Sequence, residues 1–323
     1  MELKTLEEIK YQKPAINLLK LALKKDRLSH AYLFTGIKGV GKETTARAFI
    51  LHLFCEKNRD NPCKECKSCR KVSKGVHPDI LELSPEKREI TIKQVREVIN
   101  FLKYAPLEAS YKVILIKDAE KLNPEASNAL LKSLEEPPEY ALFILLTENF
   151  TQLLPTIVSR TQVVRFRSLP EGFIAEELKK KYWLEEEIAL TLARVAQGSL
   201  GLAIEIAEKG VIEELHAFVK AGTGESELAK FKVVERLASL PKEHIEIFFY
   251  ILSMWIWISY LSKNSASIYP KAFPEKIYQG DPFKAIELIR EVQFAIERYA
   301  HQELAFFRLM LNLFPNNPQE YTT

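Results

Sequence analysis

Short continuous runs of apolar residues alternate with segments of helical spacing through the first half of the chain. The apolar runs read as strands at 31–35, 80–83, 112–116 and 142–146. Helical periodicity occupies 18–28, 44–54, 91–102 and 124–134. Because strands without polar alternation are buried on both faces, this order predicts an α/β fold: a parallel sheet covered by helices on both sides.

The pattern changes after Arg167, where strand signals stop and helical segments interrupted by glycine and proline continue to the end. We therefore expect an α/β domain at 1–167, a small helical domain at 168–210 and a larger all-α domain at 211–323. The length of 323 residues and the apolar fraction of 47% suit such a multidomain chain.

The longest apolar run, 247–261, raises the question of a membrane span. Fifteen helical residues rise only about 22 Å, whereas the hydrocarbon core of a bilayer is about 30 Å thick. We expect a buried helix and no membrane. The charged N-terminal residues also lack the apolar run of a signal peptide, which predicts a cytoplasmic, reducing location.

Charge is distributed unevenly, although the formal net charge is only +3. Up to Pro170 the chain has 29 basic and 21 acidic residues, and after it 17 basic and 22 acidic. The basic excess therefore belongs to the predicted α/β domain, the part suited to contact with phosphate.

A glycine-rich loop between the first predicted strand and helix has the G-x4-G-K spacing of a phosphate loop. Gly36, Gly39 and Gly41 would let backbone N–H groups approach phosphates, and Lys42 would reach the terminal ones. The next position holds Glu43 in place of the serine or threonine that ligates Mg²⁺. Its carboxylate would also repel a triphosphate on the same loop.

A second element of Mg²⁺ handling is altered as well. Where an aspartate should end the strand at 112–116 and hold the metal, the chain has Lys117 followed by Asp118. We expect a nucleotide-binding fold that has lost hydrolysis. Whether this chain still binds ATP stays open, and an unusual Mg²⁺ site formed by Glu43 and Asp118 is the alternative.

The four cysteines of the chain, Cys55, Cys63, Cys66 and Cys69, form the pattern C-x7-C-x2-C-x2-C. In a reducing compartment this spacing predicts a Zn²⁺ site at 55–69, and four filled positions make it structural. An iron–sulfur cluster is the leading alternative, and disulfides or unrelated thiols are others. A free-standing zinc-containing DNA-binding module also stays open.

Ser159 and Arg160 follow the last predicted strand. An arginine at the rim of a nucleotide-fold sheet can stabilise charge on a phosphoryl group bound by a neighbouring subunit. A solvated or locally paired arginine is the more common case.

Several motifs, taken in order, resemble those of clamp-loader subunits of bacterial replication. They are SHAYLF at 29–34, the four-cysteine insertion, GVHPD at 75–79, NALLKSLEEPP at 128–138, TEN at 147–149 and LPTIVSR at 154–160. The resemblance covers about 25–210. Beyond that it rests on length and helical character.

The resemblance implies an AAA+ module, made of the α/β domain and a helical lid, followed by a C-terminal helical collar that joins partner subunits. It also implies membership of the DNA polymerase III holoenzyme, with motor and delta subunits, the sliding clamp and, through the complex, primed DNA as partners. The family's motor subunit keeps the residues that this chain replaces at Glu43, Lys117 and Gly201. The resemblance therefore implies a non-hydrolysing subunit whose Arg160, after Ser159, is offered in trans to ATP on an adjacent motor subunit. Thr161 replaces the family's usual cysteine.

Overall fold

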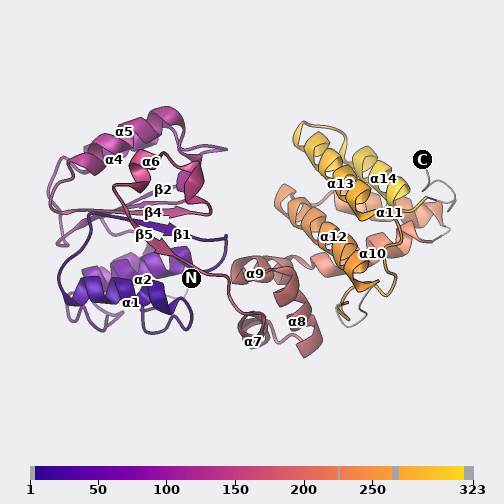
Figure 1. Cartoon of the computed structure of the whole chain (residues 1–323), viewed down its shortest axis with the longest axis horizontal. Helices are drawn as coiled ribbons and strands as arrows, with labels where there is room; N and C mark the ends of the chain where they lie inside the picture. Colours follow the sequence, from indigo (N-terminus) through magenta and orange to yellow (C-terminus); the bar gives the residue numbers. More distant parts are fainter. Residues whose placement is uncertain (1–3, 225, 264–268, 316–323) are drawn as a thin grey trace. The chain divides into compact units, whose positions relative to one another are not determined.

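The computed structural model describes residues 4–224, 226–263 and 269–315. It divides into two compact units, Met1–Leu169 and Pro170–Thr323. The first contains the sheet, and helices make up the second (Figure 1).

The first unit is built on a five-stranded parallel sheet in the order β2-β3-β4-β1-β5. The strands are β1 (Ala31–Thr35), β2 (Ile80–Leu83), β3 (Lys112–Ile116), β4 (Ala141–Thr147) and β5 (Gln162–Arg165). The apolar runs therefore predicted β1 to β4. The edge strand β5 was not predicted, because its Gln-Val-Val-Arg sequence is polar at both ends and only Val164 is buried.

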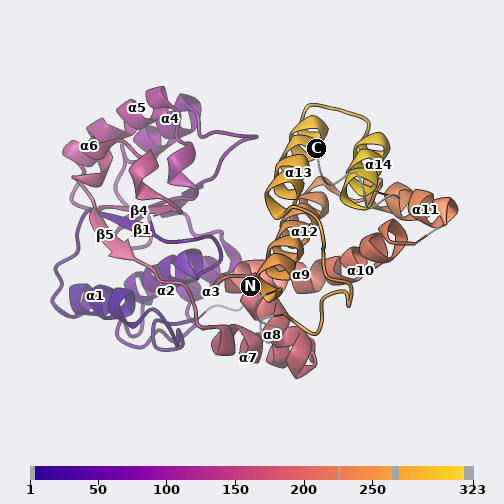
Figure 2. The same ribbon diagram turned by 45° about the vertical axis from the view of Figure 1, so that its right-hand side comes forward.

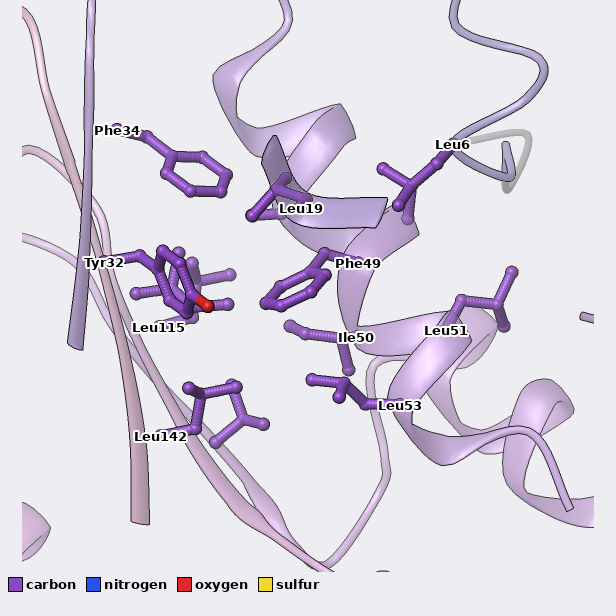
Figure 3. Packing of buried hydrophobic residues seen from close by; sticks show 14 of the residues in the cluster. Leu6, Leu19, Tyr32, Phe34, Phe49, Ile50, Leu51, Leu53, Leu115 and Leu142 are labelled. Atoms are coloured by element: carbon purple, nitrogen blue, oxygen red, sulfur yellow. The ribbon is translucent and has the colours of Figure 1, made fainter. Parts of the chain in front are cut away.

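Helices cover both faces of this sheet, which confirms the predicted α/β fold (Figure 1). One face carries α1 (Lys13–Lys24), α2 (Lys42–Phe54) and α3 (Lys67–Lys74). The other carries α4 (Ile92–Phe101), α5 (Pro124–Glu135) and the short α6 (Pro155–Val158). Figure 3 shows the first core, where Tyr32 and Phe34 of β1 face Phe49 of α2.

Local signals explain where these helices begin. Thr91 caps α4 through a capping box with Gln94, and Asn123 accepts the backbone N–H of Ala126 at the start of α5. The expected helix at 18–28 instead begins at Lys13, because Pro14 suits the first turn of a helix, and it ends before Asp26, whose φ is 49°.

All the regular secondary structure in the described residues of the second unit is helical (Figure 2). They are α7 (Glu171–Tyr182), α8 (Glu186–Val195), α9 (Leu200–Lys209), α10 (Val211–Gly222), α11 (Glu227–Ala238), α12 (Lys242–Ser262), α13 (Pro282–Glu297) and α14 (Gln302–Leu313). Helices α7, α8 and α9 contact one another, and α10 to α14 pack together. The division of this unit at 210/211 stays a prediction.

Helix α12 is longer than its apolar run and, with 21 residues, is long enough and apolar enough to cross a membrane. The length argument from the sequence was therefore wrong. Burial identifies its role: 61% of its most apolar window is buried inside the structure, with Phe248, Leu252 and Trp255 among the buried residues. It is a core helix of the second unit.

Candidate functional site

The predicted phosphate loop lies between β1 and α2, as the sequence indicated. Gly36 is required there, because a Cβ atom would come within 2.6 Å of the carbonyl oxygen of Phe166. Gly41 caps α2 with a φ of 96°. The loop therefore keeps the backbone that its glycines predict.

Lys42 does not extend into open space above this loop. Its ammonium donates to the carbonyl oxygen of Gly36 and, at 3.0 Å, to that of Ile37, and the residue is buried. Burial lowers the pKa of Lys42, and the nearby carboxylates of Glu148, Glu120 and Asp118 oppose that shift. The lysine is thus bonded to the loop that would hold phosphates.

Glu43 and Lys117, the two residues that replace the expected Mg²⁺ ligands, contact each other directly. Glu43 Oε1 lies 2.8 Å from Lys117 Nζ. Lys117 Nζ also lies 3.2 Å from Glu82 Oε2, and Arg47 bonds both Glu82, at 2.8 Å, and Glu43, at 2.9 Å. These four residues form a closed ring of alternating charges, here called the four-charge ring.

The ring keeps Glu43 ionised. Partial burial opposes ionisation, but hydrogen bonds to Lys117 and then Arg47 outweigh it and lower the pKa of Glu43. An ammonium therefore replaces the carboxylate that would hold a divalent cation in a working site, and it bonds the residue that replaces the hydroxyl ligand.

Arg160 lies in the turn between α6 and β5. Its Nη2 is 2.7 Å from Glu135 Oε1, and its Nη1 donates to the carbonyl oxygen of Thr156 at 3.1 Å. Ser159 Oγ donates to the same carbonyl at 3.0 Å. The arginine is thus locally paired, and because β5 follows it, it does not lie after the last strand as expected.

Arg160 and the phosphate loop lie at opposite ends of the parallel strands. Gln162, just after Arg160, pairs with Tyr32 near the start of β1, whereas the loop follows Thr35 at the end of β1. Lys117 likewise follows the carboxyl end of β3. Because all five strands run in parallel, Arg160 lies at their amino ends and the loop lies at their carboxyl ends. The length of the strands therefore separates the two.

The four cysteine side chains converge as the spacing predicted, with all four Sγ atoms within 4.8 Å of one another. Cys55 ends α2, Cys66 caps α3, Cys69 lies in its first turn, and Cys63 comes from the loop between. Tetrahedral Zn–S bonds of 2.3 Å place sulfur atoms about 3.8 Å apart. The 3.7 Å between Cys55 Sγ and Cys63 Sγ fits that geometry.

Backbone N–H groups point at the sulfur atoms and orient them. Cys63 N–H donates to Cys55 Sγ, Cys66 N–H to Cys63 Sγ and Cys69 N–H to Cys66 Sγ, at 3.3 to 3.4 Å. The N–H groups of Glu65 and Cys66 lower the pKa of Cys63 to about 6, whereas burial raises the pKa of Cys69. Such donors favour thiolates, the form that binds metal.

The GVHPD segment, quoted only for its resemblance, has a structural role that sequence reasoning missed. Asp79 is fully buried, and its carboxylate accepts the N–H groups of Leu107, Glu108 and Ala109 at 2.7 to 2.9 Å. His77 bonds Ser68 Oγ at 2.9 Å in α3. The segment thus fixes the loop before β3 and the helix that carries Cys69.

The chain is similar in sequence to subunits of DNA polymerase III. The family model described as "DNA polymerase III, delta subunit" matches residues 11–170. The Bacillus subtilis DNA polymerase III subunit delta' is 30% identical over 248 residues, which cover 76% of this chain and 70% of that protein. The Haemophilus influenzae subunit tau/gamma is 34% identical over 214 residues, 64% of this chain. This chain spans only 31% of the tau/gamma length.

Among solved structures, a DNA polymerase III gamma subunit-related protein from Thermotoga maritima is similar to this chain. The alignment covers 92% of this chain and 97% of the Thermotoga chain, at 20% sequence identity and a TM-score of 0.49. The parallel sheet with helices on both faces and a G-x4-G-K loop after β1 gives the chain the α/β fold class of phosphate-loop proteins. Within that class, the sequence matches show that it belongs to the DNA polymerase III clamp-loader family, which includes delta' subunits.

Proposed function

We propose that the chain is the delta' subunit of a clamp loader, hydrolyses no ATP itself, and offers Arg160 to ATP bound by a neighbouring motor subunit. It would act in the cytoplasm, with motor and delta subunits, while the complex loads the sliding clamp onto primed DNA. The carrying observation is the direct contact between Glu43 and Lys117.

The four-charge ring supports the lack of hydrolysis. Hydrolysis needs a divalent cation to neutralise charge between the β- and γ-phosphates. Here Glu43 bonds Lys117 and Arg47, so a cation would have to displace two positive groups from it. The alternative Mg²⁺ site of Glu43 and Asp118 is disfavoured for the same reason.

The placement of Arg160 supports a role in trans. Arg160 lies at the amino ends of the strands, whereas the chain's own phosphate loop lies at their carboxyl ends. Its guanidinium is therefore suited to a phosphate on another subunit. Ser159 would hold the turn, because it bonds the same carbonyl as Arg160.

Exposed apolar residues of the second unit support binding of partner subunits through a collar at 211–323. Leu228 and Phe231 of α11 and Leu304 of α14 are more than half exposed, and the Phe231 and Phe307 rings are 6.0 Å apart. Large apolar side chains gathered at one surface are typical of protein interfaces. A lid at 168–210 would join this collar to the α/β unit.

For the cysteine cluster we propose one structural Zn²⁺ bound by Cys55, Cys63, Cys66 and Cys69. It would connect the end of α2 to α3, and it takes no part in phosphate chemistry, because four thiolates fill a tetrahedral ion.

Measurement of ATP turnover by the purified chain tests the absence of hydrolysis. We expect no turnover above the background of a Lys42→Ala control. Turnover that Lys42→Ala abolishes would overturn the proposal and identify an ATP-hydrolysing subunit. Reconstitution with a motor and a delta subunit tests the assembly: a complex of defined stoichiometry is expected, and failure to assemble contradicts it.

A further inference from the structure

Glu135 holds the guanidinium of Arg160 in the isolated chain. The carboxylate accepts from Nη2 at 2.7 Å, while the carbonyl oxygen of Thr156 accepts a hydrogen bond from Nη1 at 3.1 Å. Glu135 is the last residue of α5, which precedes β4, and Arg160 precedes β5, so both residues lie toward the amino ends of the parallel strands.

Stability of α5 does not account for this glutamate. A carboxylate in the last turn of a helix interacts unfavourably with the partial negative charge of that terminus. The adjacent Glu136 is also exposed and has no ion pair among the described residues, which makes it a matched comparison. The contact that distinguishes Glu135 is the one with Arg160.

Arg160 can exchange Glu135 for another anionic partner. The two side chains are 35% and 47% exposed, and a solvent-exposed pair of this kind shifts an equilibrium by no more than about fivefold. A triphosphate carries more charge and offers several oxygens to the same fork of donors. It would therefore displace Glu135, whereas rigid positioning of a catalytic group requires buried, tightly packed support.

We propose that Glu135 competes with the neighbouring subunit's phosphate for Arg160, and so restrains trans activation in the complex until ATP occupies the neighbouring site. This inference rests on the proposed function of Arg160. The ion pair stabilises the state in which Arg160 does not yet contact phosphate, but it does not stabilise the transition state. Removing the pair therefore raises kcat/KM for ATP by a factor that corresponds to the free energy of the pair.

The test is kcat/KM for ATP in the reconstituted complex with Glu135→Gln, with Glu136→Gln as the control. We expect Glu135→Gln to raise kcat/KM about two- to fivefold, and Glu136→Gln to leave it unchanged. A fall in kcat/KM would mean that Glu135 positions Arg160, and no change would mean that the pair does not compete; either result overturns the proposal.

The same pair of variants in an Arg160→Ala background separates this inference from the function on which it rests. Without Arg160, Glu135→Gln is expected to have no effect, and a rise that persists overturns the competition. If Arg160→Ala by itself leaves turnover unchanged, the trans role fails. In the isolated chain, the Arg160 Nε–H resonance should shift with Glu135→Gln and not with Glu136→Gln; no shift would show that the pair is absent in solution.

Discussion

The carboxylate of Glu43 and the ammonium of Lys117, from the start of α2 and the end of β3, form an ion pair of 2.8 Å. Each is a replacement that, considered alone, only removes a Mg²⁺ ligand. Together, with Arg47 and Glu82, they make an electrically balanced ring in which each charge contacts two of opposite sign. The two replacements therefore compensate each other.

This compensation predicts that Glu43→Gln and Lys117→Met are not additive. Each single change leaves a half-buried charge with one partner fewer, which should lower the free energy of unfolding by about 1 kcal/mol. The double variant should lose less than the sum of the two losses. Urea unfolding of the wild type, the two single variants and the double variant measures the coupling between the two residues. Strict additivity would show that the pair contributes nothing to stability.

The cysteine cluster predicts one zinc ion per chain. Metal analysis of protein purified without added zinc should find it, and Cys69→Ser should reduce the content and destabilise the first unit. A loss of about 3 kcal/mol would lower Tm by roughly 6 to 12 °C. Iron, with visible charge-transfer absorption, is the result that would exclude a zinc site.

Asp79 predicts a large local effect far from any phosphate chemistry. Asp79→Ala removes the acceptor of three backbone N–H groups, so unfolding should become easier by about 2 to 4 kcal/mol. The exposed Asp60→Ala serves as the control. If both variants unfold at the same denaturant concentration, the role assigned to the GVHPD segment is wrong.

His52 predicts a pH dependence of stability. It is buried, its Nδ1 lies 2.7 Å from the carbonyl oxygen of Arg59, and its Nε2 accepts the N–H of Leu6 at 3.2 Å. Burial lowers the pKa of His52, although Arg59 and Glu7 oppose the shift. The unfolded chain therefore takes up the proton first, and stability that is complete above about pH 6.5 falls as the pH drops toward the folded pKa.

The measurement is the free energy of unfolding between pH 8 and 5.5. His52→Gln should flatten the fall, whereas His30→Gln, at an exposed site, serves as the control. An unchanged slope in His52→Gln would show that another group controls this dependence.

The sequence predicted the elements whose signals are local. Continuous apolar runs located β1 to β4, and the C-x2-C spacing predicted the convergence of the four thiols, because two-residue gaps keep successive cysteines close in space. The ring of Glu43 and Lys117 was not predictable, since it depends on the strand order, with β4 between β1 and β3. The contacts of Arg160 with Glu135 and of Asp79 with the loop at 107–109 depend on tertiary packing in the same way.

The central claim is that Arg160 acts on a neighbour's ATP, and DNA-stimulated ATP turnover of the reconstituted complex tests it most directly. Arg160→Ala should lower turnover at the site it serves on the order of 10³-fold. Arg165→Ala, an exposed arginine on β5, is the matched control and should leave turnover unchanged. Equal turnover in wild type, Arg160→Ala and Arg165→Ala would contradict the claim.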